Sequence, residues 1–259
     1  MATRFAKAAN QATLPPPYSQ VRTHMTEPSA IALSTIPVGH EAPAADVAAE
    51  PVSPAELAAH LAARMCHDYI SPAGAIISGL DLLEDPTAQD MKEEAMQLIA
   101  SSAKKLVDLL AFDRVALGSS TAAESFDPRA LEALANGVFA HGRAALVWSV
   151  EPETLNKPAA RALLNLAQIG LGALPTGGVA TVTAVTYEGD IAITVDCQGA
   201  RARLRPVVID GLEGRRLDEG LAGLWVQAYY LRQMIDQVGG TLTYEASDER
   251  VTLRARVAI

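Results

Sequence analysis

The chain of 259 residues is 49% hydrophobic and carries a formal net charge of −9. That length suits one large domain or two small ones, and the charge argues against nonspecific nucleic-acid binding, which needs clustered Lys and Arg. The two cysteines, Cys66 and Cys197, offer neither a metal-ligand spacing nor a disulfide framework, as expected in a reducing cytoplasm. No run reaches the roughly 18 apolar residues of a membrane span, and the amino terminus lacks a secretory signal. We therefore expect a soluble cytoplasmic protein that contacts neither nucleic acid nor membrane.

Residues 1–52 are rich in Ala, Pro, Thr and Ser and show no sustained hydrophobic periodicity. Such a segment cannot bury enough apolar surface to offset the entropy lost on ordering. We predict a disordered tail.

A helix is predicted from about Pro54 to Glu84. Ser53 suits the N-cap, Pro54 the first helical position, and Glu56 the first turn. The apolar residues recur at the spacing of one helix face: Leu57, Leu61, Met65, Tyr69, Ile76, Leu80 and Leu83. Pro72 removes a backbone donor and should bend the helix or loosen its turn.

A second amphipathic helix is predicted to begin at once, with Asp85 as its cap and Pro86 as its first residue, and to end near Gly118. Its apolar side is predicted to contain Met91, Ala95, Leu98, Ser102, Leu106, Leu109 and either Phe112 or Asp113. The two helices would form an antiparallel hairpin over residues 53–121, which cannot close a core by itself. Either two copies pair into a four-helix bundle, or the hairpin packs on the rest of its own chain; periodicity does not decide between them.

Residues 122–259 alternate between helical and strand patterns. Helices laid on an antiparallel sheet form an α/β sandwich, so we predict an α+β chain overall. The predicted helices are 127–139, 156–174 and 221–237, and the predicted strands are 145–150, 179–187, 191–196, 241–245 and 250–257.

His67 falls about 190° from the centre of the first helix's apolar stripe, at 100° per residue. It should therefore stand on the outer face with its imidazole open to solvent. A lone histidine there is usually a solvated surface residue. Here, however, Asp68 follows directly and Pro72 lies five residues on.

The pattern His67-Asp68-x-x-x-Pro72 resembles the H-box of histidine kinases, whose histidine is phosphorylated. The longer run ARMCHDYISPAGAIISGLDLLEDP more closely resembles the ChpT family of alphaproteobacterial histidine phosphotransferases. The resemblance covers roughly Pro54 to Ile259. It implies a homodimer with a four-helix bundle, followed by a degenerate histidine-kinase ATPase-like domain. It also implies partners: the receiver domain of a hybrid histidine kinase of the CckA type, and response regulators of the CtrA and CpdR types.

Compared with kinase motifs, the second region has lost residues that nucleotide binding needs. Ile169 stands where the second Asn of the N-box would coordinate Mg²⁺, and a hydrocarbon offers no oxygen ligand. Gln198 and Ala200 replace the two glycines of the first glycine box, although Asp196 is retained. We expect no ATP binding and no cofactor of its own, with Asn165 and Asp196 holding the fold.

We expect His67 to attack the acyl phosphate of a receiver aspartate through its distal ring nitrogen, with Mg²⁺ supplied by the receiver. Asp68 would orient the ring, or else serve as a plain surface or capping residue. Receiver-binding residues are expected around His67: Ala63, Arg64, Ile70, Ser71, Gly74 and Ile77. Alternatively, Ile70 and Ile77 widen the bundle core.

The leading hypothesis is a histidine phosphotransferase that relays phosphate between receivers. An active histidine kinase with unusual motifs is a second hypothesis, against which Ile169 argues. A third is a dimeric adaptor that binds a receiver without exchanging phosphate.

Overall fold

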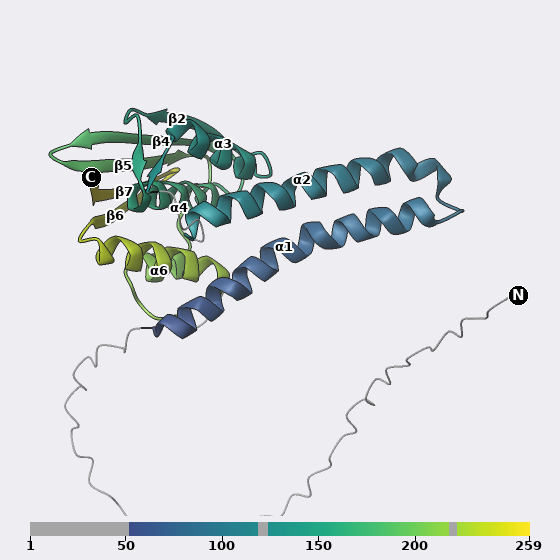
Figure 1. The fold of residues 1–259 in the computed structure, drawn as a ribbon, viewed down its shortest axis with the longest axis horizontal. Helices are drawn as coiled ribbons and strands as arrows, with labels where there is room; N and C mark the ends of the chain where they lie inside the picture. The colour runs from purple at the N-terminus through teal and green to yellow at the C-terminus, as the bar shows by residue number, and fades with distance from the viewer. Residues whose placement is uncertain (1–51, 119–123, 218–221) are drawn as a thin grey trace, which may run out of the picture. The chain divides into compact units, whose positions relative to one another are not determined.

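In the computed structural model, residues 52–118, 124–217 and 222–259 are described. They all belong to one compact unit, Ala48–Ile259. The tail predicted to be disordered lies outside the described residues, apart from Val52. The described chain forms a helical hairpin followed by an α/β sandwich (Figure 1). Its elements are α1 (Pro54–Glu84), η1 (Gln89–Met91), α2 (Lys92–Ala116), β1 (Ser125–Phe126), α3 (Pro128–Phe139), β2 (Ala144–Val150), β3 (Leu155–Asn156), α4 (Lys157–Ala173), β4 (Gly178–Tyr187), β5 (Asp190–Gln198), α5 (Pro206–Leu212), α6 (Ala222–Gln237), β6 (Thr241–Ser247) and β7 (Arg250–Ala258).

Helix α1 begins and ends where the sequence predicts. The Ser53 side chain accepts a hydrogen bond from the backbone N–H of Glu56 at 3.2 Å, which satisfies one of the free donors of the first turn. Pro72 lies inside the helix and is buried. The cap and the apolar spacing together were therefore enough to locate this helix.

The predicted start of the second helix is wrong. Asp85 ends α1 instead of capping α2, and its carboxylate accepts hydrogen bonds from both the backbone N–H and the hydroxyl of Thr87, each at 2.7 Å. These bonds form a turn, a common use of aspartate outside helices. The short helix η1 follows, and α2 begins only at Lys92, without a side-chain cap.

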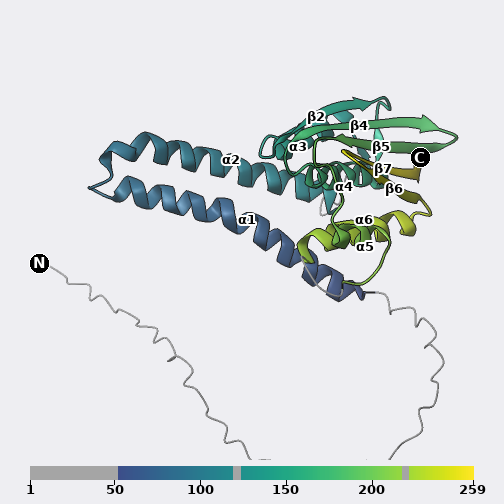
Figure 2. The ribbon, with the colours of Figure 1, turned by 180° about the vertical axis from the view of Figure 1, so that it is seen from behind.

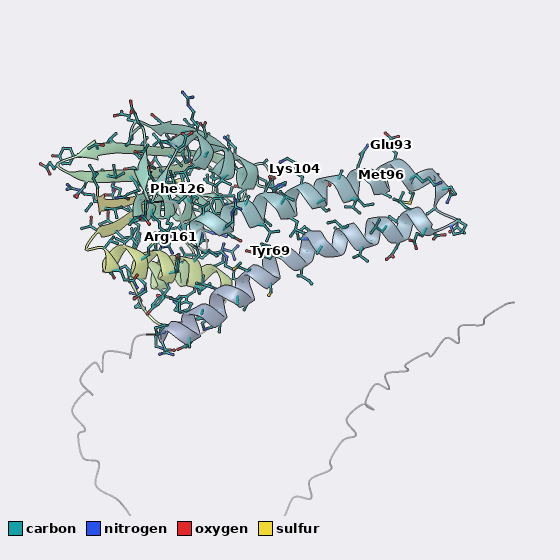
Figure 3. All side chains as sticks on the ribbon, in the orientation of Figure 1. Tyr69, Glu93, Met96, Lys104, Phe126 and Arg161 are labelled. Carbon is teal, nitrogen blue, oxygen red and sulfur yellow. The ribbon has the colours of Figure 1, made fainter. Side chains whose placement is uncertain are left out.

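The two helices of the hairpin pack closely over part of their length. A Cβ added at Gly79 would lie 2.6 Å from the side chain of Ile99, so glycine is what permits this approach. Tyr69 of α1, labelled in Figure 3, donates a hydrogen bond to Asp113 of α2 at 2.7 Å. Of the stripe predicted on α2, the buried members are Ala95, Ser102, Leu109, Phe112 and Asp113. Met91 and Leu98 are exposed in the single chain, where a second copy would have to cover them.

The sandwich contains a five-stranded sheet in the order β2-β4-β5-β7-β6, with α3, α4 and α6 against one face (Figures 1 and 2). The prediction of a wholly antiparallel sheet is wrong, because β2 and β4 pair in parallel from Ala144↔Gly178 onward. Helix α4 connects these two strands, and a helical crossover is what lets consecutive strands run in the same direction. The other pairs are antiparallel.

The core lies between the sheet and helix α4, which is buried along most of its length. The strands alternate as a half-buried strand should: Ile191, Ile193, Val195 and Cys197 of β5 are all buried. Trp225 and Tyr229 of α6 are buried and stacked on one another in a second, smaller apolar cluster. The short helix α5 was not predicted, although Pro206 at its first position is a typical start signal.

The hairpin is joined to the sandwich at both of its ends. Leu57 and Leu61 of α1 pack on the Trp225–Tyr229 cluster of α6, so the beginning of the apolar stripe is covered by the same chain. At the end of α2, the Asn165 amide donates to the carbonyl oxygen of Ala116 at 2.8 Å. Arg161, labelled in Figure 3, donates to the carbonyl oxygen of Leu117 at 3.3 Å. These side chains satisfy carbonyl groups that a helix end leaves unpaired.

Candidate functional site

His67 stands on the outer face of α1, as its position in the apolar pattern predicts. Its side chain is 87% exposed. Its Nδ1 lies 3.1 Å from Oδ1 of Asp68, the next residue along the helix. Because a carboxylate can only accept a hydrogen bond, this contact places the ring proton on Nδ1. The Nε2 atom then keeps its lone pair, which makes it a nucleophile that a partner can reach.

Asp68 has a second neighbour that the sequence analysis did not assign to it. Its other oxygen, Oδ2, lies 3.4 Å from Nε of Arg64, one helical turn earlier. The spacing of four residues on a helix was a sufficient signal for this ion pair. Arg64, Asp68 and His67 therefore form a continuous chain of polar contacts along α1.

The surface around His67 combines small residues with exposed apolar ones. Ile70 is 71% exposed and Ile77 is 58% exposed, unusual values for large aliphatic side chains. Ala63, Ser71 and Gly74 are exposed as well, and a Cβ added at Gly74 would meet nothing within 4 Å. Within the described residues, all the residues predicted for this site thus lie along α1 near His67, with Arg64 the most buried.

A cleft of about 470 Å³ opens beside His67. One wall is α1, and the other comes from Arg205 and from the start of α6, residues 222–224. The volume falls within the range of roughly 300–1,000 Å³ that ligand pockets occupy. The sequence alone could not predict this cleft, because its two walls are far apart in the chain.

Beneath the helix surface, Tyr69 and Asp113 link the two helices of the hairpin. Burial raises the pKa of Asp113 above its ordinary value, although the hydrogen bond from Tyr69 and the charge of Arg64 act against this rise. Burial and the neighbouring Asp113 also raise the pKa of Tyr69. A buried carboxyl of this kind is an anchor between helices and lies away from the outer face.

The positions compared above with kinase nucleotide motifs hold structural contacts. Asp196 accepts hydrogen bonds from Arg250 at 2.7 Å, Gln198 at 2.7 Å and Thr252 at 3.0 Å. Burial by itself would raise the pKa of Asp196, but these hydrogen bonds and the Arg250 charge hold it below its ordinary value. The side chain of Asn165 is fully buried and joins α4 to the end of α2.

Next to Ile169 the chain leaves a cavity of only about 150 Å³. This is below the roughly 300 Å³ at which ligand pockets begin. Two of its lining residues, Gln168 and Gln227, are hydrogen-bonded to each other. Among the residues that the structure describes, no group of three or more His, Cys, Asp or Glu side chains is placed to hold a metal ion.

Comparisons with known proteins agree on one family. Residues 128–250 match the model of the histidine phosphotransferase C-terminal domain. The chain is 32% identical over 205 residues to protein phosphotransferase ChpT of Brucella abortus (strain 2308), covering 79% of this chain and 97% of that protein.

Solved structures extend this likeness to the fold. The structure of a bacterial phosphotransferase matches with a TM-score of 0.70 and 32% identity, covering 78% of this chain and 97% of that one. The histidine kinase domain of the Erythrobacter litoralis EL346 blue-light activated kinase covers 73% of this chain and 93% of that one, with a TM-score of only 0.42 and 11% identity. That value is too low to support an argument. Within residues 52–118, 124–217 and 222–259, no helix has the length and apolar character that crossing a bilayer requires.

Proposed function

The chain belongs to the ChpT family of histidine phosphotransferases, and on that premise we propose that His67 is the residue that carries the phosphoryl group. The chain acts as a phosphotransferase in a phosphorelay. The observation that carries the assignment is the geometry of His67: an exposed ring whose Nδ1 is held by Asp68 and whose Nε2 is open.

The proposed chemical step needs no proton transfer. Nε2 of neutral His67 attacks the phosphorus of an aspartyl phosphate on a receiver domain. A nitrogen–phosphorus bond forms as the phosphorus–oxygen bond to the receiver carboxylate breaks. The ring thereby gains a positive charge while its Nδ1 keeps its proton, and Asp68 at 3.1 Å stabilises that charge. The reverse step on a second receiver regenerates neutral His67.

Positioning and charge stabilisation supply most of the catalysis in phosphoryl transfer. We assign charge neutralisation on the phosphoryl oxygens to Mg²⁺ that the receiver domain brings with it. This chain then contributes the nucleophile, its orientation and a surface that excludes water.

The docking surface is assigned to the exposed residues that flank His67. Ile70 and Ile77 supply apolar contact area, and small residues let a receiver approach the ring closely: Ala63, Ser71 and Gly74. Arg64 lies at the margin of this surface, in the cleft beside His67. An apolar patch with small neighbours is typical of protein-binding surfaces.

A homodimer is proposed because the outer side of α2 carries a second apolar face. Met96, Val107 and Leu110 are exposed, with Val107 at 63%, and they recur on one side of the helix. This α2 face lies about 120° from the side that packs on α1, at 100° per residue. Pairing it with the hairpin of a second copy would form a four-helix bundle.

The second domain is proposed to be a degenerate kinase ATP-binding domain that no longer binds nucleotide. The small cavity beside Ile169 and the contacts that occupy Asp196 support this proposal. We propose a cytoplasmic relay in which the donor is the receiver of a hybrid kinase of the CckA type and the acceptors are regulators of the CtrA and CpdR types.

The test uses two donors. The protein is incubated with labelled ATP alone, and separately with a labelled phosphorylated receiver, in wild-type and His67→Ala forms. We expect label only from the receiver and only in the wild type. Label from ATP alone would make the protein a kinase, and no label from either donor would favour a receiver-binding adaptor. Receiver-dependent label in His67→Ala would move the site elsewhere.

A further inference from the structure

The carboxylate of Asp68 is shared between two basic side chains. Oδ1 faces Nδ1 of His67 at 3.1 Å, and Oδ2 faces Nε of Arg64 at 3.4 Å. A carboxylate held at one oxygen cannot rotate freely about its terminal bond, so the direction of the other oxygen is also restricted. The ring nitrogen that donates a hydrogen bond to Asp68 is the one that keeps the proton. By fixing Oδ2, Arg64 therefore influences which nitrogen of His67 is free to react.

Arg64 is more buried than Asp68 and His67. Its side chain is 13% exposed, against 32% for Asp68 and 87% for His67. It lines the cleft between α1 and the start of α6. A Cβ added at Gly223 would lie 3.7 Å from Cγ of Arg64, so the start of α6 lies close to the arginine stem. The second domain therefore forms the opposite wall of the cleft in which Arg64 lies.

We propose that Arg64 is a positioning residue that acts through Asp68 to hold His67 in the tautomer with a free Nε2. In this inference, which rests on the proposed function of His67, the second domain contributes to phosphotransfer by fixing Arg64. The guanidinium suits this role because it is planar and permanently charged, whereas the ammonium of lysine is a point charge on a flexible stem.

Arg64 also affects Asp113, and this effect must be distinguished from its effect on His67. Asp113 is buried, and the charge of Arg64 acts on it as well as on Asp68. Replacing Arg64 can therefore lower the stability of the hairpin. For this reason each variant is first compared by its unfolding midpoint, and the decisive measurement is a signal from the His67 ring itself.

The first measurement is the tautomer of His67, read from ¹⁵N NMR of the ring nitrogens in the unphosphorylated, full-length protein. It is made at about pH 8, above the ordinary histidine pKa of about 6.5, and the His67→Ala spectrum identifies the signals. In the wild type we expect the proton mainly on Nδ1. In Arg64→Gln and in Asp68→Asn we expect the population to shift toward a proton on Nε2, with Arg64→Lys between these and the wild type. Arg129→Gln, on the exposed side of α3, is the matched control and should leave the tautomer unchanged.

The second measurement is the rate of phosphoryl transfer from a phosphorylated receiver under single-turnover conditions. We expect Arg64→Gln to slow the step about fivefold, the effect of weakening one hydrogen bond to a charged group at an exposed site. Arg64→Lys should recover part of this rate. The proposal is overturned if a folded Arg64→Gln protein keeps the wild-type tautomer of His67. If such a protein also transferred phosphate slowly, Arg64 would be a contact for the receiver and not a positioning residue. Either result leaves His67 as the carrier, whereas label retained by His67→Ala would instead contradict the proposed function.

Discussion

The hairpin and the sandwich differ in how much of their apolar surface is buried within one chain. The sandwich buries its strands and most of α4 in a continuous core, and of its large hydrophobic side chains only a few at its margins are exposed. The hairpin leaves large apolar side chains exposed on both helices and on η1 between them: Ile70, Ile77, Leu80, Met91, Met96, Leu98, Val107 and Leu110. The sandwich therefore buries its apolar surface within one chain, whereas the hairpin leaves apolar surface that we propose other molecules cover.

The ionisable side chains of the two regions also differ in their surroundings. In the sandwich, Asp196 is enclosed by three donors and its pKa is lowered. In the hairpin, Asp113 is buried with Tyr69 and its pKa is raised, while His67 is left open to solvent. Asp196 is thus held in structural contacts, whereas the residue that we propose as the phosphate carrier lies on the helix surface.

The largest effect is expected from a charge placed on the docking surface. Ile70→Asp should slow transfer from a receiver by about 30-fold or more, because docking would bury an unpaired carboxylate at a cost of at least about 2 kcal/mol. The measurement is single-turnover phosphotransfer. Val147→Asp, an exposed valine of β2 in the sandwich, should transfer at the wild-type rate.

A loss of transfer that coincided with a loss of helical circular dichroism or of dimeric mass in Ile70→Asp would contradict the docking assignment. The alternative in which Ile70 belongs to the bundle core would then be favoured.

The next effect concerns the α2 face. Val107→Asp places a charge on each of the two faces that would meet in a dimer, so we expect dimer dissociation to become at least about tenfold more favourable. Sedimentation equilibrium measures this directly. Val179→Asp, at an exposed valine of β4, should leave the mass unchanged. A wild-type protein that is monomeric at all concentrations would rule out the bundle.

A smaller effect is expected in the sandwich. Asp196→Asn should lower the free energy of unfolding at pH 7 by about 1–2 kcal/mol, through weaker hydrogen bonds with Arg250 and Thr252. Because the folded-state pKa of Asp196 is depressed, its contribution is present above the unfolded value near 3.8 and is lost as pH falls through the folded value.

Urea unfolding at several pH values checks this. The gap between wild type and Asp196→Asn should be constant above about pH 5 and should close as the solution becomes more acidic than pH 4. A gap that persisted unchanged in acid would show that charge is not the cause.

The smallest effect is expected in the hairpin and has the opposite dependence on pH. The folded-state pKa of Asp113 is raised, so its contribution to stability is fully present below the unfolded value of 3.8 and is lost as pH rises through the folded value. Asp113→Asn keeps an acceptor for Tyr69 without a buried charge. We expect it to raise the free energy of unfolding at pH 7 by less than about 1 kcal/mol, and to make no difference in acid.

Comparing this variant with Asp196→Asn in the same urea series tests the contrast between the two regions. If both variants lost stability in parallel at neutral pH, the assignment of Asp113 as a poorly solvated carboxyl would be wrong.

Much of this architecture could be predicted from local patterns. Ser53 and Pro54 located the start of α1, the apolar spacing placed His67 opposite Tyr69, and the strand patterns at 179–187 and 191–196 located β4 and β5. These features depend on neighbours in the sequence, where caps, periodicity and turn residues act.

The rest depends on contacts that no local pattern contains. Asp85 and Pro86 have the form of a helix start, but a hydrogen bond to Thr87 makes them a turn. Strand direction is not encoded in alternation, so the parallel pairing of β2 with β4 was missed. Arg64 and Gly223 line the same cleft from helices that are far apart in the sequence, and only the fold could place the two together.

We propose that phosphate enters this chain on Nε2 of His67 from a receiver. The most direct test is NMR of the full-length protein, ¹⁵N-labelled at histidine, after incubation with a phosphorylated receiver and without ATP. We predict a phosphorus–nitrogen coupling at Nε2 of His67, with Nδ1 still protonated and hydrogen-bonded to Asp68. A coupling at Nδ1, or phosphate found on any other residue, would contradict the account.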